Sequence, residues 1–155
     1  MVDWATLLSA GVGAGIGITS TLLTDKVRWR RDHLDRRRES NRQLYAEYLA
    51  ALWRTLDDIR DASRNVGLTG DERGRIARDA FKNGGAYALR YQVSVVAGDG
   101  VERASAAALR TLRDLRDLVE SGITFGEPPY RELRRSFDER YAELRLEMRT
   151  EAGLP

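Results

Sequence analysis

Apolar and polar residues alternate along most of this chain with the period of an α-helix. A first set of apolar or small side chains recurs at intervals of three and four residues: Tyr45, Leu49, Leu52, Leu56, Ile59, Ser63 and Val66. Side chains with this spacing lie on one face of a helix, where they pack against neighbouring helices. Gly67 and Gly70 follow. The pattern therefore predicts an amphipathic helix that ends near residue 66.

The next segment opens with a helix-start signal. Thr69 and Glu72 have the spacing of a capping box, in which the hydroxyl and the carboxylate each accept a hydrogen bond from a free backbone N–H. Small and apolar residues then follow at helical spacing: Ile76, Ala80, Gly84, Tyr87, Tyr91 and Val95. Residues 91–96 (YQVSVV) are β-branched enough to form a strand. We favour a helix because an isolated strand would have no partner sheet, and the strand remains the alternative.

Two further helices are predicted toward the carboxyl end. Asp99 and Glu102 resemble another cap, and Pro128 or Pro129 suits the first turn of the last helix. The third helix has the stripe Val101, Ala104, Ala108, Leu112, Leu115 and Val119. The fourth has the stripe Tyr130, Leu133, Phe137, Tyr141, Leu144 and Met148. Four amphipathic helices with short connections predict an all-α fold, an antiparallel four-helix bundle.

The amino-terminal segment has a different pattern. Residues 4–23 (WATLLSAGVGAGIGITSTLL) contain no charged side chain. At about 1.5 Å per residue, a helix of this length spans roughly 30 Å, the thickness of the hydrocarbon core of a bilayer. A cleaved signal peptide would carry positive charge before its apolar run, whereas only Asp3 precedes this one. The glycines also lack the G-x-G-x-x-G spacing of a dinucleotide site. We predict a single uncleaved transmembrane helix.

Basic residues crowd the segment after this apolar run. Residues 25–42 carry eight basic and four acidic side chains, while the whole chain has a net charge of only +2. Lys and Arg beside a spanning helix stay on the cytoplasmic side, which places the amino terminus outside and the rest in the cytoplasm. We expect a single-pass protein of the inner (plasma) membrane, in three segments: an anchor at 1–24, a polar stalk at 25–43 and a cytoplasmic bundle at 44–155. Whether anchor and stalk form one continuous helix is left open.

Two sets of residues are candidates for membrane contacts. Aromatic and basic side chains at the two ends of the anchor suit the lipid headgroups: Trp4, Trp29, Lys26, Arg28, Arg30 and Arg31. A face of small residues, which lets two helix backbones approach closely, is formed by Gly11, Gly13, Gly15 and Gly17. We predict membrane-interface contacts for the first set and helix pairing for the second.

The chain offers few candidate catalytic or metal-binding residues. There is no cysteine, and His33 is the single histidine, so thiol catalysis, cysteine-ligated metals and Ser-His-acid triads lack their components. Asp57, Asp58 and Asp61 lie among arginines, which favours surface ion pairs over a metal or acid/base cluster. We predict a protein that is not an enzyme and has no catalytic, cofactor-binding or metal residue.

A stretch of the first bundle helix, RRRESNRQLYAEYLAALW, resembles a loose group of uncharacterised small bacterial proteins. These proteins join an amino-terminal anchor to an arginine-rich Y-A-E-[YF]-L-A-A-L helix, and the ending EMRTEAGLP is similar too. The resemblance implies a membrane-anchored helical domain without an assigned activity. It transfers no functional residue.

These observations leave three functional hypotheses, of which the third, an enzyme of unrecognised type, lacks a plausible nucleophile-base pair. The leading one is a membrane-tethered, non-enzymatic interaction or scaffold module that contacts the lipid bilayer and binds a protein partner or a second copy of itself. The alternative is a phage-type envelope protein resembling an inner-membrane spanin, which would need the domain outside the cytoplasm. Nucleic-acid binding is disfavoured, because no recognised reading motif is present.

Overall fold

The protein is an all-α helical bundle in the part of the chain that the structure describes. The structure is a computed structural model that describes residues 38–154. A helix over residues 38–64, which we call the leading helix, precedes the four labelled helices: α2 (Gly70–Asn83), α3 (Ala86–Val96), α4 (Asp99–Glu120) and α5 (Pro128–Glu151). No strand is found between residues 38 and 154. The predicted all-α fold is confirmed.

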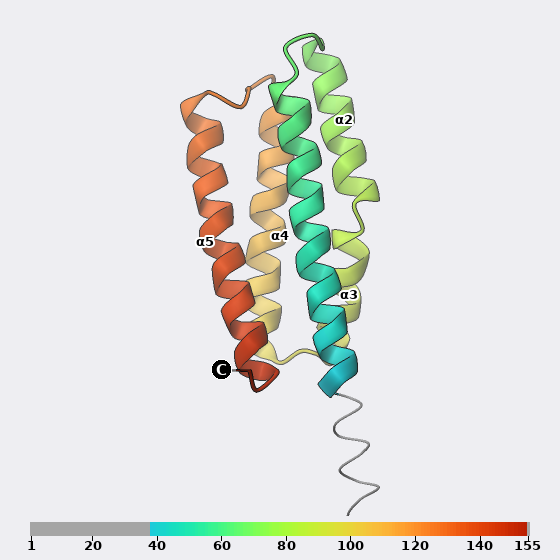
Figure 1. The fold of residues 1–155 in the computed structure, drawn as a ribbon. Coiled ribbons are helices and arrows are strands. Elements are labelled where there is room, and N and C mark those ends of the chain that lie inside the picture. Colours follow the sequence, from blue (N-terminus) through green and yellow to red (C-terminus); the bar gives the residue numbers. More distant parts are fainter. Residues whose placement is uncertain (1–37, 155) are drawn as a thin grey trace, which may run out of the picture. The chain divides into compact units, whose positions relative to one another are not determined.

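The helices run up and down. In Figure 1 the leading helix and α4 point one way, whereas α2, α3 and α5 point the other way. The helices α2 and α3 follow one another along the same edge and together take the place of one helix of the bundle. Residues from Asn41 onward belong to one compact unit.

The predicted anchor and most of the predicted stalk lie outside the described residues. Among residues 38–154, no helix combines the length and the apolar character needed to cross a membrane. The transmembrane helix at 1–24, the stalk and their continuity therefore stay predictions.

The leading helix buries five of the seven predicted stripe residues together with four others, and Leu49 is half-buried. Buried side chains of this helix are Tyr45, Tyr48, Ala51, Leu52, Thr55, Leu56, Ile59, Ala62 and Ser63. Val66 is 96% exposed, because the helix ends at residue 64 and Val66 lies in the following turn. The buried face is thus wider than a heptad seam, as expected for a helix that contacts several neighbours.

A break at Gly84 and Gly85 divides the predicted second helix into α2 and α3. Gly85 has φ 80°, a left-handed conformation that residues with a Cβ adopt only at a cost. Gly84 has an ordinary helical φ of −67°, but a Cβ there would overlap the hydroxyl of Thr55 on the leading helix. Residues 91–96 lie in α3, so the favoured helix is confirmed and the strand alternative is wrong.

The apolar stripe predicted for this part of the chain is wrong over α3, whereas its residues Ile76 and Ala80 in α2 are half-buried and Ala80 packs against the core. Its members Tyr87, Tyr91 and Val95 are 44%, 54% and 84% exposed. The residues that α2 and α3 bury instead are Gly74, Ala77, Phe81, Ala86 and Val93. The glycine break interrupts the helical phase, so a periodicity read across it follows no single face.

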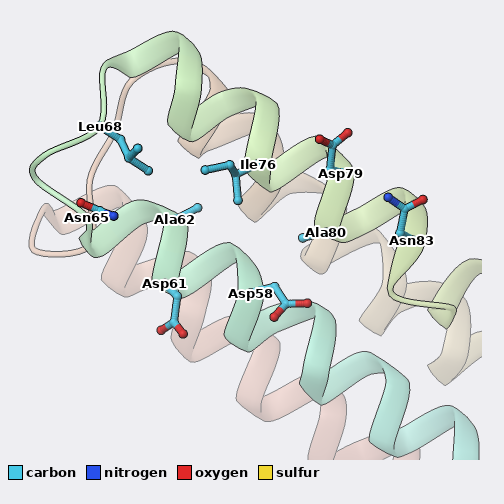
Figure 2. Close-up of a pocket in the computed structure, with 9 residues that line it drawn as sticks. All are labelled: Asp58, Asp61, Ala62, Asn65, Leu68, Ile76, Asp79, Ala80 and Asn83. Atoms are coloured by element: carbon cyan, nitrogen blue, oxygen red, sulfur yellow. The ribbon is translucent and has the colours of Figure 1, made fainter.

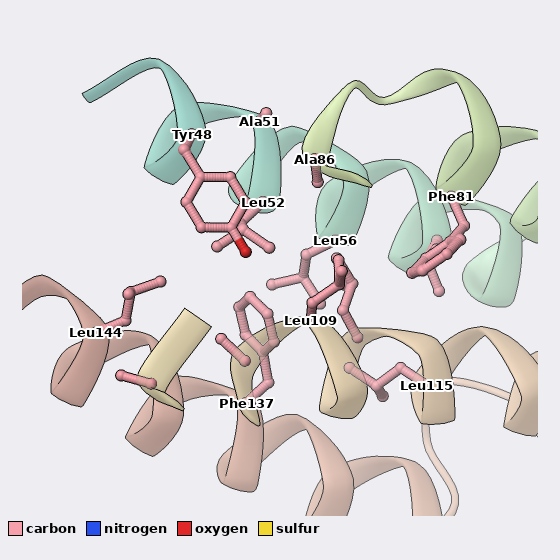
Figure 3. Packing of buried hydrophobic residues seen from close by; sticks show 14 of the residues in the cluster. Tyr48, Ala51, Leu52, Leu56, Phe81, Ala86, Leu109, Leu115, Phe137 and Leu144 are labelled. Carbon is pink, nitrogen blue, oxygen red and sulfur yellow. The ribbon is translucent and has the colours of Figure 1, made fainter. Parts of the chain in front are cut away.

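The predicted stripes of α4 and α5 are confirmed. All six stripe residues of α4 are buried, and α5 buries Tyr130, Phe137, Leu144 and Met148. Figure 3 shows Phe137 and Leu144 of α5 near Leu109 of α4 and Tyr48 of the leading helix. Burying one such large side chain stabilises the fold by about 1.5–3 kcal/mol. This core holds the helices in register.

The helix ends agree with the sequence at two places and differ at one. Thr69 caps α2 in the predicted capping box, and its N–H and hydroxyl hold the pKa of the Glu72 carboxyl below its usual value. A proline begins α5, as expected. The predicted Asp99 cap is wrong, because α4 is capped by Gly98, whose N–H donates to the carboxylate of Glu151 at 3.0 and 3.1 Å. A carboxylate from α5 thus accepts from the N–H of the cap residue itself, and no side chain of residues 38–154 accepts from the N–H groups of the first turn of α4.

Candidate functional site

The membrane candidates named from the sequence all fall within residues 1–37. Trp4, Trp29, Lys26, Arg28, Arg30 and Arg31 lie outside the described residues, as do Gly11, Gly13, Gly15, Gly17 and His33. Their roles stay predictions.

The bundle core contains few polar side chains. The Tyr48 hydroxyl lies 3.0 Å from Oγ of Ser105, and the Thr55 hydroxyl donates to the Ala51 carbonyl at 2.9 Å. Burial raises the pKa of Tyr48, while Ser105 and the Arg90 guanidinium act in the opposite direction. Within residues 38–154 no group of three or more His, Cys, Asp or Glu side chains is placed to hold a metal ion.

A cleft lies between the leading helix and α2, and we call it the acidic cleft. Its volume is about 500 Å³. The residues that line it are Asp58, Asp61, Ala62, Asn65, Leu68, Ile76, Asp79, Ala80 and Asn83. Figure 2 shows Ala62, Leu68 and Ile76 facing the space between the two helices, with the carboxylates of Asp61 and Asp79 toward its outer sides. The cleft thus has an apolar floor and an acidic rim.

The charge on this rim is only partly compensated. Asp61 lies 3.7 Å from Nε of Arg60, and Asp79 lies 3.4 Å from Arg75, both in exposed ion pairs that contribute little. Asp58 makes no ion pair with residues 38–154, and no basic side chain lines the cleft. The acidic cleft can therefore attract a cation.

The sequence predicts the ion pairs of the acidic cleft in part, but not which aspartates share the cleft. It assigned Asp57, Asp58 and Asp61 to surface ion pairs, and the contact of Asp57 with Arg60 at 3.1 Å agrees with that. It missed the joint position of Asp58 and Asp79, which come from different helices. Their proximity depends on how the leading helix and α2 are aligned, and no short motif encodes that alignment.

A second hollow lies between α3 and α4, which we call the arginine cleft. Its volume is about 180 Å³, and Tyr87, Arg90, Tyr91, Ala106, Leu109, Arg110 and Arg113 line it. No sequence pattern signals this cleft, because the spacing of Tyr87 and Tyr91 predicts core positions for both side chains.

Comparison of the chain with protein-family models, with curated proteins and with solved structures found no match.

Proposed function

We propose that this protein is a membrane-tethered, non-enzymatic interaction module whose bundle binds a basic segment of a partner protein in the acidic cleft. The tether is the apolar run of residues 4–23, and the following arginines favour a cytoplasmic position for the bundle. The acidic cleft is the observation that carries the proposal, because it joins an apolar floor to an acidic rim in which Asp58 has no ion pair in the described part of the chain.

The chemistry of the cleft supports a peptide segment as its occupant. Ala62, Leu68 and Ile76 offer apolar contact, which suits the stem of a lysine or arginine or a small apolar side chain. The carboxylates at the rim then pair with the cationic ends. Charge complementarity of this kind sets specificity and the rate of association more than affinity.

Site-specific photocrosslinking tests the binding. The full chain carries p-benzoylphenylalanine at Ile76, on the cleft floor, and is irradiated in native membranes; the crosslinked peptide is then sequenced by mass spectrometry. We expect a peptide rich in Lys and Arg, and a yield that falls as salt rises, because at 0.1 M salt charges are screened beyond about 10 Å.

Matched charge variants make the test specific. Asp58→Asn with Asp61→Asn removes two charges from the rim, whereas Glu132→Gln with Glu139→Gln removes two from the exposed surface of α5. The first pair should abolish the crosslink and the second should leave it. Equal yields from both variants, or an acidic crosslinked peptide, would refute binding in this cleft.

Reporter fusions at the carboxyl terminus test the tether and its direction. A cytoplasm-dependent reporter should be active, and a periplasm-dependent one should not. The opposite result would reverse the orientation and favour the spanin-like alternative. Recovery of the full chain in the soluble fraction would reject the tether altogether.

A further inference from the structure

Three arginine residues line the arginine cleft. Arg90 comes from α3, and Arg110 and Arg113 come from successive turns of α4. No carboxylate lines the cleft. Three like charges in one hollow repel each other, so the cleft is suited to an anion.

These arginines also lack protein partners. Elsewhere in the bundle, Arg60 and Arg116 make ion pairs with nearby carboxylates. None of Arg90, Arg110 and Arg113 makes one with the residues that the structure describes. The Nε of Arg90 is moreover buried and has no hydrogen-bond partner. The positive charge of Arg90 is therefore not balanced by a carboxylate of the described residues, and an anion in the cleft would balance it.

Two tyrosines, Tyr87 and Tyr91, also line the arginine cleft. The hydroxyls of Tyr87 and Tyr91 lie 2.8 Å apart, and their rings meet edge to face at 5.1 Å. One hydroxyl proton is used between the two oxygens, and the other remains available to a ligand. The hydrogen bond to Tyr87 raises the pKa of Tyr91, so the Tyr91 hydroxyl keeps its proton at neutral pH. The tyrosine pair therefore adds a neutral donor beside the three cations.

We propose that the arginine cleft binds a phosphate-bearing group. Guanidinium forks match the tetrahedral oxygens of phosphate, and a doubly charged phosphate balances several guanidinium groups better than a single carboxylate does. The source is either a soluble phosphate compound or a lipid phosphomonoester headgroup. The proposal does not depend on the acidic cleft, which lies between the leading helix and α2.

The test follows a fluorine label in the cleft. The full chain, with 3-fluorotyrosine at position 91 only, is held in dodecyl maltoside micelles and titrated with pyrophosphate while its ¹⁹F spectrum is recorded. In a second arm the micelles are doped with phosphatidic acid, or with phosphatidylglycerol as a phosphodiester of the same net sign. A saturable shift with pyrophosphate supports a soluble source, and a shift with phosphatidic acid alone supports a headgroup.

Two double variants separate a site from general attraction. Arg110→Gln with Arg113→Gln should weaken binding at least tenfold, whereas Arg131→Gln with Arg135→Gln, which removes the same charge from the exposed face of α5, should leave it within twofold. All four side chains are exposed, so the bundle should fold in both variants, and circular dichroism checks this. No shift with any probe, or equal weakening in both variants, overturns the proposal.

Discussion

Replacing Gly84 with alanine should destabilise the bundle because the leading helix approaches this position closely. A Cβ at Gly84 would overlap the Thr55 hydroxyl and lie 3.1 Å from Thr55 Cβ and 2.7 Å from the Ala80 carbonyl oxygen. Overpacking of this kind costs about 1–3 kcal/mol. Alanine also reduces the conformational entropy of the unfolded chain, which stabilises the folded protein by about 0.4–1 kcal/mol and offsets part of this cost. We expect a net loss of about 1–2 kcal/mol in the free energy of unfolding.

Thr55→Ala provides the decisive second mutation. Without the hydroxyl, the overlap with Thr55 Oγ1 disappears while the close contact with the Ala80 carbonyl oxygen remains, so Gly84→Ala should cost about 1 kcal/mol less in that background. The adjacent Gly85 is the matched control, because a Cβ there meets nothing within 4 Å and its left-handed φ of 80° alone opposes alanine. Gly85→Ala should destabilise the protein equally with Thr55 or Ala at position 55.

Urea unfolding of the four variants of each cycle, followed by circular dichroism, measures these couplings. The full chain is used in neutral detergent, so that all variants share the same surroundings. Additive effects at Gly84 and Thr55 would show that close approach is not the reason for glycine at position 84. A coupling of similar size between Gly85 and Thr55 would refute the assignment of separate causes to the two glycines.

Three further predictions concern the core, a cap and pH. Phe137→Ala, which empties a fully buried position, should cost about 3–5 kcal/mol by urea unfolding, while Leu146→Ala, at a 64% exposed position, should cost at most about 0.5 kcal/mol. Thr69→Ala removes the capping box of α2 and should cost about 1 kcal/mol in the same assay. Burial raises the pKa of Tyr130 above its unfolded value of about 10, so its stabilising contribution is complete below pH 10 and is lost as pH rises further. Urea midpoints measured from pH 8 to 11 should fall above pH 10, and less steeply in Tyr130→Phe; equal slopes would contradict the burial argument.

The helices with strong, uninterrupted periodicity were predictable. In α4, Leu112 and Leu115 fall on the buried face as their spacing requires, and in α5 Phe137 and Leu144 do the same. Each of these helices is longer than 20 residues and lacks an internal break. Several turns of consistent spacing leave only one face that can be buried.

The region of α2 and α3 was not predictable in the same way. Its buried residues include Ala77, Gly74 and Ala86, which are too small to stand out in a hydrophobic pattern. The tyrosines, which do stand out, face the arginine cleft instead. The pair Gly84 and Gly85 indicates a break in the helix, but it does not predict by how much the helix direction changes there.

The two clefts could not be predicted from the sequence, for a related reason. Asp58 and Asp79 share one cleft, and Arg90 and Arg110 share the other, yet each pair joins different helices. Charged side chains carry no periodic signal that fixes which turn of one helix faces which turn of another. That alignment is set by the core, through contacts such as Tyr48 with Ser105.

The left-handed Gly85 has a consequence for how the bundle opens. Only Ala86 and Val93 of α3 are buried, so α3 contributes little to the core, and the break at Gly85 separates it from α2. A segment with few buried contacts can unfold locally while the rest stays folded. Its backbone amides should therefore exchange with deuterium sooner than those of α4. Since a ligand that binds only the closed form stabilises it by mass action, exchange in α3 would also report occupancy of the arginine cleft.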